Sequence, residues 1–255
     1  MNMVSSEEII DGLRNIKQKR ESSWPKALWR ASSLGKCMRL QTLNALGTQI
    51  LVTPRQERLL SIHTGFHEAV QEMIKDSYNM KMIEYEFVDK ELCVSGHIDA
   101  IITDGERPIV VEVKTLNSFF AKRVRAWYNG EKDATEPYWI PQVNLYRHHV
   151  TNNPDFPGEA IGVSLICTDD GVITPFVEEE NNDFLNELEV LLACWRTKTV
   201  PPRSEKSGFL GCDDCPLKHI CSEPYEMIDD FVDHAKSYLM ENRMAILKED
   251  KAIET

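Results

Sequence analysis

The segment IVVEVKT at residues 109–115 constrains the fold more than any other part of the chain. Its apolar, mostly β-branched residues are typical of a strand buried in the middle of a sheet. Because side chains alternate between the two faces of a strand, Glu112 and Lys114 share one face. A buried carboxylate and a buried ammonium are costly unless they pair or bind an ion. The segment therefore predicts a central strand that carries a polar site.

A hairpin places a second carboxylate beside this pair. Residues 91–103 alternate as a strand does, and the turn TDGERP that follows contains an Asp-Gly hairpin signal. The hairpin brings Asp99 alongside the face of Glu112 and Lys114. Magnesium and manganese prefer carboxylate and water oxygens, so this group would suit a divalent cation. On the hairpin alone, an exposed Glu–Lys pair without a ligand is an equally good interpretation.

The remaining patterns predict helices around a small sheet. Strand patterns cover residues 83–89, 91–103, 109–115, 160–168 and 172–178. Helical patterns cover residues 5–20, 38–50, 54–78, 117–128, 141–150, 181–197 and 225–247. We therefore expect an α/β fold with a small, mixed central β-sheet flanked by helices.

Charge and hydropathy limit the partners of this chain. The net charge of −12 argues against nonspecific binding of nucleic acid, but residues 14–39 hold eight basic residues and one acidic residue. This basic segment is compatible with DNA binding, and an ordinary solvated surface explains it as well. No apolar run approaches the ~20 residues that span a bilayer, and the N-terminus lacks the apolar core of a signal peptide. We expect a cytoplasmic protein without a membrane partner, in which clustered cysteines indicate metal binding or catalysis.

Three cysteines with C-x2-C-x5-C spacing form an incomplete metal site, because tetrahedral zinc and most iron–sulfur clusters take four ligands. They are Cys212, Cys215 and Cys221. Cys37 and His219 are the candidates for the fourth ligand, and the spacing alone does not separate an iron–sulfur cluster from zinc. The remaining cysteines lie among apolar residues and are best explained as small hydrophobic side chains: Cys93, Cys167 and Cys194.

Two predicted helices carry polar pairs at positions i and i+4, which share one helix face. His63 and His67 form one pair, and Gln142 and Tyr146 form the other. A single histidine on a helix is most often structural or exposed. The order of these pairs along the chain, relative to the hairpin and the cysteines, is more informative than either pair.

Because the hairpin, the polar helix pairs and the cysteines follow one another in this order, the sequence resembles the PD-(D/E)XK nuclease superfamily. Within that superfamily it resembles the RecB-like exonucleases. These include the CRISPR-associated nucleases that hold an iron–sulfur cluster with four cysteines. The matching segments, which span residues 32–221, are SSLGKCMR, HTGFHE, GHIDA, VEVKT, QVNLY and CDDCPLKHIC. The resemblance implies a restriction-endonuclease-like core. It also implies an iron–sulfur-clasped helical region that joins the N- and C-terminal parts of the chain.

The resemblance implies roles for individual residues. The ligands of a catalytic Mg²⁺ or Mn²⁺ would be His67, Asp99, Glu112 and the Val113 carbonyl. Lys114 would be the catalytic lysine, while Gln142 and Tyr146 would shape the DNA side of the site. The ligands of a [4Fe-4S] cluster would be Cys37, Cys212, Cys215 and Cys221. The sequence departs from the family where His63 replaces a common glycine, so His63 stays an alternative to His67.

These expectations define a function and a domain organisation. We expect a metal-dependent DNA nuclease, an exonuclease that prefers single-stranded DNA or duplex ends, which works in CRISPR adaptation, recombination or phage DNA processing with protein partners. The alternatives are a non-catalytic DNA-binding or complex-assembly module that retains the cluster, and a zinc-stabilised scaffold without nucleic-acid function. Residues 1–30 would form a helical extension, residues 31–224 the nuclease domain, and residues 225–255 a C-terminal helix and tail.

The predicted helix after the central strand carries three basic residues that we expect to point outward: Lys122, Arg123 and Arg125. They could contact a DNA backbone near the active strand. A role in keeping the surface soluble explains them equally well.

Overall fold

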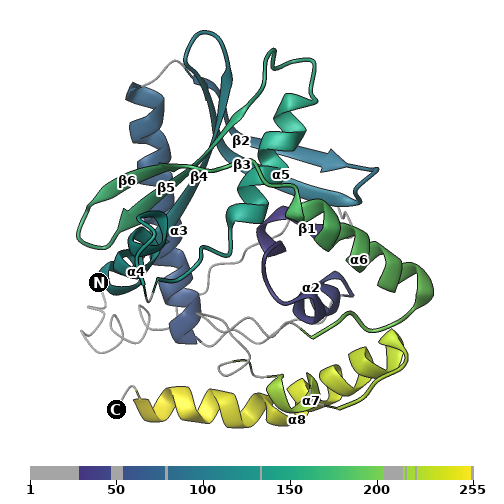
Figure 1. The fold of residues 1–255 in the computed structure, drawn as a ribbon. Helices are drawn as coiled ribbons and strands as arrows, with labels where there is room; N and C mark the ends of the chain where they lie inside the picture. The colour runs from purple at the N-terminus through teal and green to yellow at the C-terminus, as the bar shows by residue number, and fades with distance from the viewer. Residues whose placement is uncertain are drawn as a thin grey trace, which may run out of the picture.

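The computed structural model describes most of the chain (Figure 1): residues 29–46, 54–77, 80–132, 134–203, 215, 217–221 and 223–253. The side chains of residues 54–63, 77, 80–81 and 241–253 lie outside this description. The expected helix at residues 5–20 and the cysteine Cys212 also lie outside the described residues.

The described residues contain a six-stranded mixed sheet with the strand order β1-β3-β4-β5-β6, to which β2 adds by pairing with β3. The β2–β3, β3–β4 and β5–β6 pairs are antiparallel, whereas β1–β3 and β4–β5 are parallel. The strands are β1 (Trp29–Arg30), β2 (Met80–Asp89), β3 (Val94–Thr103), β4 (Pro108–Leu116), β5 (Ile161–Thr168) and β6 (Ile173–Val177). The expected α/β fold with a mixed central sheet is confirmed.

The strand β1 was not expected, because two residues are too few to show a strand pattern. It pairs with β3 at Val94 and Ser95, at the edge of β3 that β4 occupies further along. The sheet therefore begins inside the segment that the sequence assigned to a helical extension.

Helices cover both faces of the sheet (Figure 1). On one face α3 (Pro54–Ser77) packs through Val70 and Ile74 against β3 and β4. The other face is covered by α4 (Ser118–Tyr128), α5 (Ile140–Thr151) and α6 (Asp183–Thr197). Alternation along β4 explains this division, since Val111 and Val113 face α3 while Val110 faces α5. None of the helices in the described residues is both long and apolar enough to cross a bilayer.

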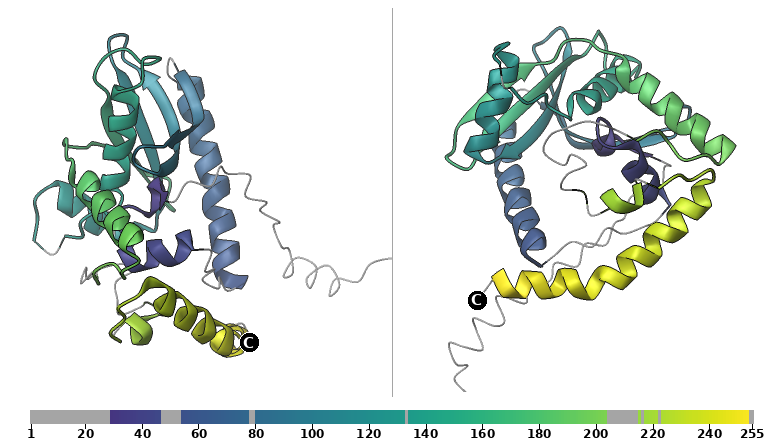
Figure 2. Two further views of the ribbon diagram at one scale, coloured as in Figure 1. Left: turned by 90° about the vertical axis from the view of Figure 1, so that its right-hand side faces the viewer. Right: turned by 60° about the horizontal axis from the view of Figure 1, so that its bottom comes forward.

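A second apolar cluster joins distant parts of the chain. The helices that carry it lie away from the sheet (Figure 2). It unites α2 (Met38–Ala45), which follows the short 3₁₀ helix η1 (Ala31–Ser33), with α7 (Lys218–Cys221) and α8 (Ile228–Ile253). Leu43 of α2 is fully buried against Phe231 and Ala235 of α8. Arg39 adds hydrogen bonds from Nε to the Pro201 carbonyl at 2.9 Å and from Nη1 to the Cys221 carbonyl at 2.8 Å. A helical region thus joins the N- and C-terminal parts, as the fold prediction requires.

Gly96 of β3 leaves room for two aromatic rings, and its substitution tests this packing. A Cβ atom there would lie 2.4 Å from Phe87 Cε1 and 2.8 Å from Tyr146 Cε1. We expect Gly96→Ala to lower the free energy of unfolding by about 1–3 kcal/mol in urea denaturation. Gly65→Ala in α3 is the matched control, because nothing lies within 4 Å of its Cβ position. It should stabilise the protein by up to about 1 kcal/mol, and equal stability of the two variants would contradict the packing argument.

Candidate active site in the gap between strands β1 and β4

The candidate site lies where one edge of β3 has no partner strand. On that edge β1 pairs as far as Ser95, and β4 pairs only from Ala100 onward. Gly96, His97 and Asp99, between these two pairings, face a cavity of about 420 Å³. Its lining consists of Arg30, Ser32, His67, Ser95, Gly96, His97, Asp99, Glu112, Lys114, Gln142 and Tyr146. The site therefore occupies an interruption of the sheet.

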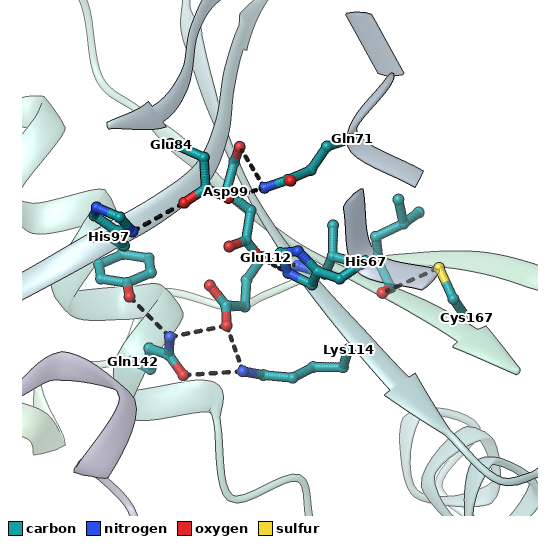
Figure 3. A network of polar contacts seen from close by, with 12 residues as sticks. His67, Gln71, Glu84, His97, Asp99, Glu112, Lys114, Gln142 and Cys167 are labelled. Carbon is teal, nitrogen blue, oxygen red and sulfur yellow. Dashed lines mark hydrogen bonds and ion pairs between the residues drawn. The ribbon is translucent and has the colours of Figure 1, made fainter. Parts of the chain in front are cut away.

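Asp99 links β3 to β4 where these two strands separate, and it lies beside His67 (Figure 3). Its Oδ2 accepts a hydrogen bond from the Val113 backbone N–H at 2.6 Å, in a place where β4 has already separated from β3. The same oxygen lies 3.0 Å from His67 Nε2, which α3 supplies. The strands thus fix one carboxylate between a backbone amide and an imidazole.

A second polar chain begins at Glu112, which is 4% exposed. Its Oε1 accepts hydrogen bonds from Lys114 Nζ and, at 2.8 Å, from Gln142 Nε2. Gln142 also accepts from Lys114 Nζ at 3.1 Å and donates to the Tyr146 hydroxyl at 2.8 Å (Figure 3). The i, i+4 spacing on α5 therefore places both of its polar side chains over the buried end of β4. The structure brings together all the side chains that the sequence proposed for this site, apart from His63, which lies outside the described side chains.

A model of the PD-(D/E)XK nuclease superfamily matches residues 17–222 of this chain. The chain belongs to the PD-(D/E)XK nuclease superfamily. A search among curated proteins finds no match.

Solved structures with a similar course of the chain include that of SSO0001. It is 17% identical with a TM-score of 0.48, and the match covers 84% of this chain and 92% of that one. An alkaline exonuclease (LHK-Exo) from Laribacter hongkongensis is 13% identical with a TM-score of 0.38, over 62% of this chain and 76% of its own. LHK-Exo in complex with dAMP is 14% identical, also with a TM-score of 0.38, over 66% and 90% of the two chains.

The electrostatics of this PD-(D/E)XK site favour the protonated forms of Glu112, Lys114 and His67. Burial raises the pKa of Glu112 to about 7, and the negative charge of Asp99 adds to that effect. Burial opposes the charged form of Lys114, but the charges of Glu112, Tyr138 and Asp99 outweigh it, so the pKa of Lys114 is raised. Burial likewise opposes protonation of His67, yet its hydrogen bond to Asp99 raises its pKa. The site attracts positive charge.

The donors in the site suit a divalent cation. Glu112 Oε2 is buried and has no hydrogen-bond partner among the described residues, which is costly for a carboxylate oxygen. Ligand atoms of His67, Glu84 and Asp99 all lie within 4.8 Å of one another. Carboxylate oxygens with one imidazole fit Mg²⁺ or Mn²⁺. Glu112 lines the same cavity but is not part of this group of three.

Sequence reasoning missed Glu84 and His97. Glu84 adopts φ +51 within β2, a left-handed value that few residues other than glycine take in a strand. Its Oε2 lies 2.9 Å from His97 Nδ1, and its Oε1 accepts from Gln71. His97 Nε2 also lies 2.8 Å from Glu86 Oε1. Two sequence signals were available: the two acidic residues of IEYEF at residues 83–87, and the histidine of GHIDA at residues 96–100. Neither signal shows which of these side chains lies near His67 and Asp99.

Cys37 lies five residues after Ser32, which lines the cavity, whereas Cys215 lies just before α7 and Cys221 at its end. Burial raises the pKa of the Cys221 thiol, and the nearby thiols of Cys37 and Cys215 raise it further. These three therefore lie within electrostatic reach of one another. In the part of the chain that the structure describes, which leaves out Cys212, no three cysteine sulfurs lie within 4.8 Å of one another. Cys167 is fully buried, as a small hydrophobic residue is expected to be.

The basic residues of α4 divide into two groups. Lys122 and Arg123 are exposed, as expected. The outward orientation predicted for Arg125 is wrong, because it is half-buried. Its Nε and Nη2 are shielded from solvent and have no hydrogen-bond partner in the described residues. It follows the buried Val124 in the packed part of the helix, whereas Lys122 and Arg123 project into solvent.

The raised pKa of Glu112 predicts a pH-dependent stability. A carboxyl group whose pKa rises from 4.5 to about 7 on folding holds its proton more tightly in the folded state. Its contribution is therefore complete below the unfolded pKa and is lost as pH rises through the folded pKa. In metal-free protein we expect Glu112→Gln to be more stable than wild type at pH 8, by about 1–3 kcal/mol.

Urea denaturation between pH 5 and pH 8 measures this difference. The stability gained by Glu112→Gln should shrink as the pH falls toward 5. Glu106→Gln, at an exposed turn position, is the control and should follow wild type at every pH. A constant difference between Glu112→Gln and wild type over this range would contradict the expectation.

Proposed function

We propose that this PD-(D/E)XK protein is a Mg²⁺- or Mn²⁺-dependent deoxyribonuclease that hydrolyses phosphodiester bonds. The observation that carries the proposal is the convergence of Asp99, Glu112 and Lys114 on one cavity, where Glu112 Oε2 has no hydrogen-bond partner among the described residues. Buried charges of this kind are costly to fold, which favours a function over a purely structural role.

The residues of the chain divide the work of the proposed reaction. His67, Asp99, Glu112 and the Val113 carbonyl would hold the cation. Val113 donates its N–H to Asp99, and in an extended strand the carbonyl of a residue points to the same side as its N–H. When bound, a divalent cation lowers the pKa of water and offsets charge on the phosphate.

Lys114, Gln142 and Tyr146 would act on the side of the site nearer α5. Gln142 holds Lys114 in place through its amide oxygen, so the ammonium keeps one position beside Glu112. From there Lys114 would orient the attacking water or stabilise charge on the phosphate. Gln142 and Tyr146 would shape the surface that contacts DNA, together with the exposed Lys122 and Arg123.

The finer assignment rests on the resemblance to RecB-like and CRISPR-associated nucleases. It favours exonuclease action on single-stranded DNA or duplex ends, with protein partners in CRISPR adaptation, recombination or phage DNA processing. A nuclease domain over residues 31–224 would hold most of the sheet and of the site, but it would leave out β1 and the cavity residue Arg30. The C-terminal helix and tail of residues 225–255 would form a separate unit in sequence, although α8 packs against α2.

A nuclease assay tests the catalytic proposal. Lys114→Ala and Asp99→Ala should each lower the rate of DNA cleavage in Mg²⁺ or Mn²⁺ by at least about a hundredfold, because each removes a group that stabilises the transition state. Linear and circular single-stranded DNA and blunt duplex DNA should be compared, since an exonuclease spares the circle. Lys75→Ala, at an exposed position paired only with Glu72, is the control. Undiminished cleavage by both site variants would refute the site, and an inactive wild type that still binds DNA would support a non-catalytic module.

We also propose that Cys37, Cys212, Cys215 and Cys221 hold a [4Fe-4S] cluster with a mainly structural role. The charges of Cys37 and Cys215 reach Cys221, and Arg39 bonds the Cys221 carbonyl across 182 positions of sequence. Such a cluster would reinforce the apolar packing of α2, α7 and α8.

Metal analysis of cysteine variants tests the cluster. Anaerobically purified protein should be brown, and Cys37→Ala should lose iron and its visible absorbance, while His219→Ala keeps both. His219 is exposed, so its variant also controls for general damage to α7. Colourless wild-type protein with stoichiometric zinc, or loss of the metal in His219→Ala, would contradict the assignment.

A further inference from the structure

The turn before Cys37 places a second lysine beside the nuclease site. The Lys36 ammonium lies 5.3 Å from the centroid of the Tyr138 ring. The charges of Lys114 and Glu112 both act on Lys36, and Tyr138 acts in turn on Lys114. Lys36 therefore lies within electrostatic reach of Lys114, on a segment whose Ser32 lines the cavity.

The backbone around Lys36 is held firmly. Gly35 adopts φ +76, and its N–H donates to the two Glu187 carboxylate oxygens at 3.1 and 3.0 Å. A Cβ atom at Gly35 would lie 2.0 Å from the Tyr138 carbonyl oxygen, so the turn packs directly on that segment. Gln41 Nε2 donates to the Lys36 carbonyl at 3.2 Å. Lys36 therefore projects from a fixed base and not from a loose loop.

The two lysines differ in their partners. Lys114 is neutralised by Glu112 and bonded by Gln142. Lys36 is half-buried, and within the described ranges it contacts the Tyr138 ring and no carboxylate. An ammonium that loses solvent without gaining an anion is unfavourable, and Lys114 repels it as well. An anion that entered between the two lysines would remove both costs.

We infer that Lys36 is a further substrate-binding residue, which contacts a phosphate of the DNA backbone together with Lys114. The inference rests on the proposed nuclease function and adds a residue to it. The competing explanation is that Lys36 only packs on Tyr138 through its ring contact. A neutral side chain of similar length separates the two, because it keeps the packing and loses the charge.

The experiment compares Lys36→Met, Lys36→Gln and Lys36→Arg with wild type. Cleavage of single-stranded DNA in Mn²⁺ gives kcat/KM, and binding in Ca²⁺ gives the dependence of affinity on salt. Lys198→Met is the matched control, because the Lys198 ammonium also lies near an aromatic ring, 5.0 Å from the Trp195 centroid, but is exposed and distant in sequence. Thermal melting and metal content establish that each variant is folded.

Both neutral variants should lose about ten- to a hundredfold in kcat/KM, as expected for one charged hydrogen bond. The slope of log affinity against log salt should fall by about 0.7, the value for one phosphate contact on a single strand. Lys36→Arg should restore most of both quantities, and Lys198→Met should change neither.

Folded neutral variants with an unchanged salt slope would overturn the inference and leave the nuclease proposal intact. A wild-type protein that neither binds nor cleaves DNA would overturn both.

Discussion

The hydrogen bond from the Val113 N–H to the Asp99 carboxylate is the interaction on which the site depends. An interrupted β-ladder leaves backbone groups without partners, and a buried N–H without a partner is costly. The Asp99 side chain takes the place of the missing strand and satisfies that amide. Because of this replacement, β3 and β4 can separate inside the core, and a cavity can open in the middle of a sheet.

The two carboxylates of the cavity differ in how well their surroundings stabilise the charged form. Asp99 bonds to an amide and an imidazole, whereas Glu112 is more buried and, within the part of the chain that the structure describes, one of its oxygens has no hydrogen-bond partner. The two carboxylates also repel, which burial strengthens. Folding of the metal-free protein therefore favours a proton on Glu112, and binding of a cation would favour its release. The unfavourable burial and repulsion of these carboxylates thus lie at the place where the proposed chemistry occurs.

The sequence predicted the parts of the site that follow from periodicity. A strand alternates with period two, so Glu112 and Lys114 had to share a face, and a helix pairs residues four apart, so Gln142 and Tyr146 had to point together. Glu84 could not be predicted, because its left-handed backbone breaks the alternation of β2 and turns its side chain toward His67 and Asp99. Arg125 was misplaced because periodicity on a short helix does not show how far its packed face extends.

Sequence patterns could not predict the positions of β1 and Lys36 for a different reason. Both positions depend on contacts with residues that are far away in the sequence. The segment of residues 29–39 contributes a strand that ends the gap, part of the cavity wall, the turn at Gly35 and the position of Cys37. Glu187 of α6 holds that turn, and Arg39 ties the following helix to the Cys221 carbonyl. One short segment therefore connects the cysteine region with the carboxylates.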